Sequence, residues 1–210
     1  CSSTSGKITP FFDALFTSTS AVCVTGLVVV DSGSYWTMFG QAVILLLIQI
    51  GGLGVITIAV AFAMLSGKKI SLMQRSVMQS AISAPQVGGI VRMTRFILGG
   101  TFLIEITGAV AMMPSFCNRY GMRGIWMAVF HSISAFCNAG FDILGTKTHQ
   151  FASLTGYSGN GAINITIMLL IIIGGIGFLT WEDIYLNRFQ WKRYRLQSKL
   201  ILCTTAFLIV

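Results

Sequence analysis

The hydrophobic residues of this chain form long uncharged runs separated by short polar segments. The runs cover about residues 39–65, 96–113 and 162–181, and another begins at 200–210. An α-helix needs about 20 consecutive apolar residues to cross the hydrocarbon core of a bilayer. The pattern therefore predicts three membrane-spanning helices, at about 36–66, 92–114 and 162–187.

Two shorter segments repeat one motif at a spacing of 114 residues. The matched pairs are Phe16 and Phe130, Ser18 and Ser132, Ser20 and Ser134, Ala21 and Ala135, Cys23 and Cys137, and Gly26 and Gly140. Each copy predicts a short helix followed by a glycine-bearing turn. The helices are expected at about 10–21 and 124–136, and the turns at 22–27 and 137–141. Thr9 is expected to cap the first helix, with Pro10 at its first position.

Composition places the chain in a membrane. Hydrophobic residues make up 54% of the 210 residues and charged residues 10%, whereas soluble domains carry about 25% charged residues. The chain begins at Cys1 and its last apolar run is unfinished. We therefore expect an internal fragment of a longer, multi-pass protein of the cytoplasmic membrane.

The net charge of +8 comes mainly from basic residues that flank the apolar runs. One cluster is Lys68, Lys69, Arg75, Arg92 and Arg95, and the other is Arg188, Lys192, Arg193, Arg195 and Lys199. Both clusters face the cytoplasm, as the positive-inside rule requires, if residues 10–30 and 124–144 dip into the membrane and return on the same side. The charge pattern therefore favours re-entrant segments and argues against nucleic acid as a partner.

A re-entrant helix that ends in a glycine turn suits cation binding. Carbonyl oxygens replace the hydration shell of a cation when successive ones face one axis, and a glycine at positive φ permits that geometry. The candidate residues, which would hold K+ through main-chain carbonyls, are Cys23, Val24, Thr25, Gly26, Cys137, Asn138, Ala139 and Gly140. The alternative is that Gly26 and Gly140 are ordinary helix C-caps; the gapless duplication favours the ion site.

Other polar and glycine positions predict mainly structural roles. The motifs at 51–54 and 174–177 (Gly-Gly-x-Gly) are expected to pack each span against its short helix, with a gating hinge as the alternative. Glu105 lies in mid-span, where a carboxylate can be functional. We expect it instead to be a structural, hydrogen-bonded group, paired with a hydroxyl of a short helix or with His131, itself expected to be a packed residue.

The remaining acidic residues lie near the ends of the predicted spans. Glu182 and Asp183 are expected to be neutralised by the nearby Arg188. Asp13, Asp31 and Asp142 are expected at the outer face, where they could concentrate cations; for Asp13, helix capping is an equal alternative. The sequence offers no catalytic pair, so we expect neither an enzyme nor a resident cofactor.

At the repeated turns and the two Gly-Gly-x-Gly spans, the chain resembles the membrane subunit of the Ktr/Trk family of potassium transporters. The resemblance covers essentially all 210 residues. It implies four units of span, re-entrant pore helix and span around a pseudo-fourfold pore, with Gly26 and Gly140 as filter glycines. This chain would then hold a first repeat (1–91), a second repeat (92–195) and the start of a third (196–210).

The resemblance also implies function and partners. It implies a homodimer on a cytoplasmic, nucleotide-binding regulatory ring, for which residues 67–95 and 188–199 are candidate faces, with lipid headgroups as the alternative. The expected function is potassium uptake through a selectivity filter of backbone carbonyls in an all-α membrane protein, with Na+ as a conceivable coupling ion. The alternatives are a secondary transporter with broken helices and a translocator that does not distinguish Na+ from K+.

Overall fold

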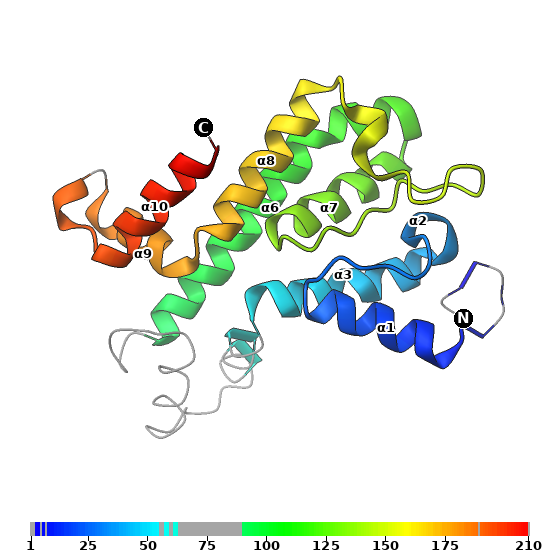
Figure 1. The fold of residues 1–210 in the computed structure, drawn as a ribbon, viewed down its shortest axis with the longest axis horizontal. Helices are drawn as coiled ribbons and strands as arrows, with labels where there is room; N and C mark the ends of the chain where they lie inside the picture. The colour runs from blue at the N-terminus through cyan, green and yellow to red at the C-terminus, as the bar shows by residue number, and fades with distance from the viewer. Residues whose placement is uncertain are drawn as a thin grey trace. The chain divides into compact units, whose positions relative to one another are not determined.

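The computed structural model describes residues 3–4, 6, 8–54, 57–58, 61–62, 90–188 and 190–209. Its helices, coloured along the chain in Figure 1, are α1 (Phe11–Val22), α2 (Ser32–Tyr35), α3 (Met38–Leu53), α6 (Ile90–Tyr120), α7 (Arg123–Phe136), α8 (Gly161–Gly175), α9 (Phe178–Asn187) and α10 (Leu196–Ile209), with 3-10 turns η2 (Ser153–Tyr157) and η3 (Trp191–Arg193). Among the described residues only Ser3 and Trp36 form an isolated antiparallel bridge. The all-α prediction is confirmed for this part of the chain, whereas the predicted cytoplasmic residues Lys68, Lys69 and Arg75 lie outside it.

Internal contacts divide the chain into two compact units. Unit 1 comprises Cys1–Gly54 and Phe102–Ile171, and unit 2 comprises Val55–Thr101 and Ile172–Val210. Each unit draws residues from both expected repeats. The division into repeats at 1–91, 92–195 and 196–210 therefore stays a prediction.

Helix α3 is the centre of packing in unit 1. It packs against both α1 and α7, and Figure 1 shows α1 and α3 side by side. Its buried apolar face carries Ile44, Leu45 and Ile48, and Phe116 of α6 and Phe130 of α7 are also fully buried in this unit. Burial of these large side chains holds α1 and α7 at fixed positions on α3.

The first short helix begins one residue later than predicted. Helix α1 starts at Phe11, and Pro10 occupies the capping position without a side-chain cap. The Thr9 hydroxyl instead accepts a hydrogen bond from the Tyr35 hydroxyl, at 3.3 Å. The prediction that Thr9 caps this helix is therefore wrong, because a distant residue engages its hydroxyl.

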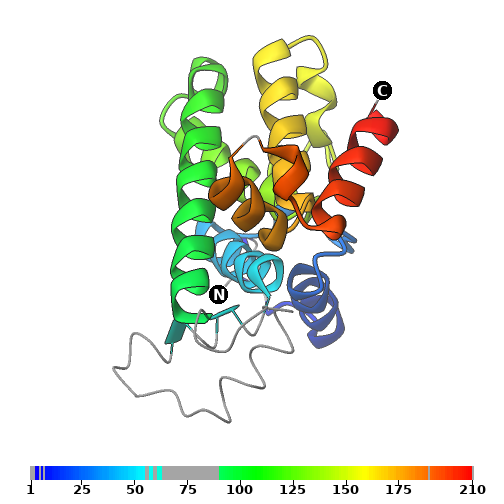
Figure 2. The same cartoon turned by 90° about the vertical axis from the view of Figure 1, so that its left-hand side faces the viewer.

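One predicted span is a long helix. Among the described residues, α6 is the one helix that is long and apolar enough to cross a membrane by itself, over Arg92–Tyr120. It continues six residues beyond the predicted end at 114, through Pro114, and Figure 2 shows it without interruption. Membrane helices tolerate an internal proline when neighbouring groups satisfy the freed carbonyl.

The other two predicted spans are interrupted at their glycine motifs. Helix α3 ends at Leu53, because Gly54 adopts a φ of +81°. Helices α8 and α9 are separated by a 92° bend, with Gly177 at a φ of +82°. The prediction of an unbroken helix over 162–187 is therefore wrong, and the bent pair adds at most a second candidate span among the described residues. Gly54 and Gly177 hold the same place in the two motifs, so the repeat extends to this backbone break.

Several helices expose side chains that a soluble domain would bury. On α1 these are Phe11, Phe12 and Leu15, and on α6 they are Phe102, Leu103, Ile106 and Val110. Contiguous apolar surface of this kind marks contact with a membrane or another protein.

Candidate functional site

The turns after α1 and α7 have the same backbone conformation. Cys23 and Cys137 end their helices with φ, ψ of −79°, −3° and −74°, −3°. The next residues, Val24 and Asn138, both have positive φ, at 56° and 57°. Gly26 and Gly140 follow at 75° and 70°. Both copies of the motif therefore alternate between negative and positive φ, which no regular helix or strand does.

Matched hydrogen bonds hold each turn against the end of its helix. After α1, the N–H groups of Cys23, Val24 and Thr25 donate to Thr19 O, Ala21 O and Ser20 O at 2.8, 3.3 and 3.0 Å. After α7, those of Cys137, Asn138 and Ala139 donate to Ile133 O, Ala135 O and Ser134 O at 2.9, 3.0 and 2.8 Å. In a trans peptide the carbonyl points opposite to the N–H. The carbonyl groups that precede these N–H groups are therefore directed away from the helix end.

The carbonyl oxygens of both turns differ from those inside a helix, which accept main-chain hydrogen bonds. Within the described part of the chain, no hydrogen bond ends on a carbonyl oxygen of residues 23–26 or 137–140. The C-terminal ends of α1 and α7, with no basic residue in their last turns, point at these groups. The partial negative charge of a helix C-terminus favours a cation there.

A serine in each short helix braces the far side of its turn. Ser20 Oγ donates to Leu27 O at 2.7 Å, and Ser134 Oγ donates to Phe141 O at 2.6 Å. The first turn has a further stabilising contact, a 2.8 Å hydrogen bond between the hydroxyls of Ser20 and Thr25. Since Ala139 has no hydroxyl, the second turn lacks this bond.

The two turns meet at their glycines. A Cβ atom added to Gly26 would lie 2.6 Å from Ala139 O and 3.4 Å from Gly140 Cα, and one added to Gly140 would lie 3.7 Å from Gly26 Cα. Any side chain on Gly26 would therefore overlap the main chain of the second turn. Among the eight candidate residues, this contact joins Gly26 of the first turn to Ala139 and Gly140 of the second.

Two neighbouring glycines of α3 contact one turn each. A Cβ on Gly51 would overlap Val22 O and lie 2.9 Å from Val24 Cγ2, and one on Gly52 would lie 2.6 Å from Cys137 Cβ. The first Gly-Gly-x-Gly motif therefore packs against both turns, where the sequence predicted contact with one short helix. Glycine is needed at these positions because the helix approaches each turn to main-chain distance.

The Glu105 carboxylate is hydrogen-bonded, but its hydrogen-bond partner differs from the predicted one. Both its carboxylate oxygens accept hydrogen bonds from Gln49 Nε2 of α3, at 2.9 and 3.2 Å. Ser132 Oγ of α7 donates to the main-chain oxygen of Glu105, at 2.6 Å, and not to its carboxylate. The prediction of a pairing with a short-helix hydroxyl or His131 is therefore wrong, and the prediction of a hydrogen-bonded carboxylate is confirmed.

His131 is packed inside unit 1, as predicted. Its Nδ1 donates to Met127 O at 2.7 Å, and its ring stacks on Phe116 with centroids 5.3 Å apart. It also lines a pocket of about 250 Å³ with Asn138 and Asp142 of the second turn.

The three outer acids differ in their surroundings. Asp31 is buried and structural: it caps α2 through Ser34 N at 2.8 Å and accepts from Phe151 N at 2.9 Å. The expectation that it concentrates cations at the outer face stays a prediction. Asp142, half-buried, accepts from Leu144 N at 3.1 Å, and Asp13 lies in the first turn of α1.

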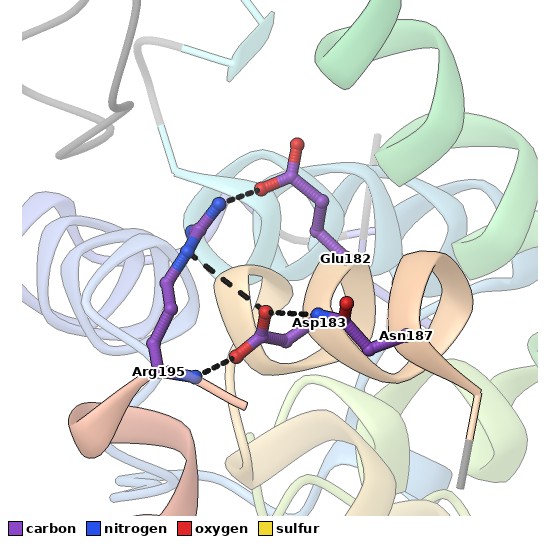
Figure 3. A network of polar contacts seen from close by, with 4 residues as sticks. All are labelled: Glu182, Asp183, Asn187 and Arg195. Atoms are coloured by element: carbon purple, nitrogen blue, oxygen red, sulfur yellow. Dashed lines mark hydrogen bonds and ion pairs between the residues drawn. The ribbon is translucent and has the colours of Figure 1, made fainter. Parts of the chain in front are cut away.

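In unit 2, Arg195 and not Arg188 neutralises the two adjacent acids. Its guanidinium lies 3.1 Å from Glu182 Oε2 and 3.9 Å from Asp183 Oδ1, as Figure 3 shows. The local neutralisation is confirmed and its predicted partner is wrong. Arg195 comes from the segment before α10, which packs against α9.

A family model described as a cation transport protein, TrkH, matches residues 2–207. The chain belongs to the TrkH family. It is 41% identical over 209 residues to the potassium/sodium uptake protein NtpJ of Enterococcus hirae, covering 99% of this chain and 45% of that protein. It is also 41% identical over 199 residues to the Ktr system potassium uptake protein B of Bacillus subtilis, covering 94% and 43%. The protein of the same name in Vibrio alginolyticus is 32% identical over 203 residues, covering 94% and 43%.

This TrkH-family chain therefore spans less than half the length of these curated relatives. The family resemblance stated from the two turns is confirmed over almost the whole chain. Sequence reasoning missed the role of Gln49, although an amide in the middle of an apolar run was a usable signal. It also missed the contact of Gly52 with the second turn, for which the sequence carries no signal.

Proposed function

We propose that the full-length protein takes up K+ across the cytoplasmic membrane, and that the ion passes the carbonyl oxygens of residues 23–26 and 137–140. The observation that carries the proposal is the meeting of the two turns, where Ala139 O lies within 2.6 Å of a Cβ position on Gly26. Carbonyl groups that accept no hydrogen bond, contributed by two turns that meet, would supply the oxygen ligands that a dehydrated cation requires.

Two turns supply half of the four contributors that a symmetric filter needs. We propose that the rest of the full-length protein provides the other two, in repeated units around a pseudo-fourfold pore. The exposed apolar faces of α1 and α6 would contact lipid or neighbouring units. The membrane potential drives inward movement by about 2.3 kcal/mol per charge per 100 mV, so no bond-making chemistry is required. A homodimer on a cytoplasmic nucleotide-binding ring belongs to the same proposal.

The test is the selectivity of full-length variants in cells that lack their own K+ uptake. Gly26→Ser and Gly140→Ser each place a side chain at positive φ, at +75° and +70°. Both are expected to lower the ratio of K+ to Na+ uptake. Gly121→Ser is the matched control, because Gly121 also has positive φ, at +59°, but nothing lies within 4 Å of its Cβ position.

The control separates backbone strain from disruption of the ion site. Left-handed strain costs about 1–2 kcal/mol at any of the three glycines, so Gly121→Ser measures the loss of protein that strain alone causes. Selectivity should fall only in Gly26→Ser and Gly140→Ser. An unchanged K+ to Na+ ratio in both, with the protein present in the membrane, would rule out the proposed ion site.

A second candidate is uptake of both Na+ and K+. The observation that favours it is the 41% identity to a relative named as a potassium/sodium uptake protein. Initial uptake rates of the unmodified full-length protein for each ion, measured separately and in competition, distinguish the two. Saturable Na+ uptake that K+ inhibits would support this candidate.

A further inference from the structure

Residues 188 and 190–199 lead from the end of α9 into the first turn of α10, and we name them the basic hairpin. Arg195 ties it to α9, since its Nη2 donates to Glu182 Oε2 at 3.1 Å and its main-chain N–H donates to Asp183 Oδ2 at 2.8 Å (Figure 3). Asp183 also accepts from Asn187 Nδ2 at 3.0 Å. The Tyr194 hydroxyl donates to Arg188 O and closes the turn. The hairpin therefore presents its remaining side chains from a fixed frame.

Arg195 uses both nearby carboxylates, so the other cations of the hairpin are not neutralised. The described residues hold no carboxylate within ion-pair distance of Arg188, Lys192, Arg193 or Lys199. Lys199 Nζ donates to Lys192 O at 3.3 Å, which places the Lys199 ammonium beside the main chain of the hairpin. Four positive charges on one short segment attract anions strongly when they are held close together.

Exposed apolar side chains accompany these charges. Trp191 is 47% exposed and Leu196 is 74% exposed, next to Lys192 and Arg193 in sequence. Tyr185 and Leu186 of α9 are also exposed. Tryptophan and tyrosine beside lysine and arginine are typical of the boundary between lipid headgroups and acyl chains. An acidic protein surface would account for the cations alone, and would leave the apolar residues in water.

We propose that the basic hairpin binds the phosphate of an anionic phospholipid headgroup, with Trp191 and Leu196 at the apolar boundary. Lysine and arginine form charge-assisted hydrogen bonds to phosphate oxygens, and each contributes to attraction toward anionic lipid near the membrane surface. The inference requires membrane location but does not depend on the ion site. Its failure would leave the K+ proposal unaffected.

The test is lipid-selective quenching of Trp191 in the full-length protein, reconstituted in phosphatidylcholine vesicles. A small fraction of either phosphatidylglycerol or phosphatidylcholine carries brominated acyl chains, which quench nearby tryptophan. The emission of Trp191 is the difference between the protein and its Trp191→Phe variant. Brominated phosphatidylglycerol is expected to quench this emission more strongly, and Lys192→Gln with Arg193→Gln is expected to reduce the preference by about 25-fold.

The matched control is Arg123→Gln with Lys147→Gln, which removes two exposed cations outside the hairpin. It is expected to keep the preference. If the double hairpin variant fails to reconstitute, Lys192→Gln and Arg193→Gln singly should each lose about a fivefold preference. Equal quenching by both lipids in the unmodified protein overturns the proposal, as does a preference that the hairpin variants retain. Loss of the preference in the control variant, or its abolition by millimolar inorganic phosphate, overturns it too.

Discussion

Replacing Gly51 by alanine should disturb the proposed ion site, although alanine favours the helix. Alanine in place of glycine stabilises a helix interior by about 1 kcal/mol. At Gly51, however, the new Cβ would lie 2.9 Å from Val24 Cγ2 and overlap Val22 O, where ordinary contact requires at least 3.4 Å. The first turn or α3 must therefore move by on the order of 1 Å, and overpacking of this kind costs about 1–3 kcal/mol.

If the turn moves to relieve this overlap, the proposed ion site is deformed. Since about 1.4 kcal/mol corresponds to tenfold in an equilibrium, the K+ to Na+ uptake ratio should fall between about fivefold and about a hundredfold. The assay is initial uptake of both ions by the full-length protein in cells without their own K+ uptake, normalised to the amount of protein in the membrane. Gly52→Ala should act similarly through the second turn, because its Cβ would lie 2.6 Å from Cys137 Cβ.

Gly99→Ala is the matched control for both variants. Gly99 also lies inside a helix, α6, but its Cβ position has nothing within 4 Å. It should retain selectivity and be neutral or slightly stabilising. A wild-type ratio in Gly51→Ala and Gly52→Ala, or an equal loss in Gly99→Ala, would refute the argument that main-chain proximity to α3 sets the position of the turns.

Two further predictions concern single hydrogen bonds. Thr25→Ala removes the 2.8 Å hydrogen bond to Ser20 Oγ, which is worth about 1 kcal/mol. It should lower the K+ to Na+ uptake ratio by up to about fivefold, whereas Thr25→Ser should retain the ratio. Equal uptake ratios in the two variants would exclude a role for the hydroxyl. Glu105→Ala leaves Gln49 Nε2 without its acceptor and should lower the thermal midpoint of the purified full-length protein, while Glu105→Gln should lower it less and keep transport. Loss of uptake in Glu105→Gln at an unchanged midpoint would instead assign Glu105 to transport.

The positions of the two short helices and their turns followed from the sequence. Helix α7 begins at Arg123 and α1 at Phe11, each within a residue of its predicted start. The left-handed glycines Gly26 and Gly140 lie where the repeated motif places them. These features depend on hydrogen bonds between residues at most seven positions apart, so a short window of sequence contains both partners.

Partners distant in sequence could not be predicted in the same way. The pairing of Glu105 with Gln49, of Thr9 with Tyr35, and of Asp31 with Phe151 joins residues from separate helices or loops. For each of these residues, the sequence offered either a nearer hydrogen-bond partner or no partner. The hydrophobic pattern also predicted a longer α3 and an unbroken span to 187, because a glycine inside an apolar run is compatible with either a continuous or a broken helix.

The sequence by itself determined that two copies of one helix and turn occur in an apolar, all-helical chain of the TrkH family. Only the tertiary structure decided that the turns meet at Gly26 and Gly140, and that adjacent glycines of α3 contact one turn each. The physical reason is that the conformation of each turn is set by its own helix end. The distance between the turns is set by how closely a third helix can approach them.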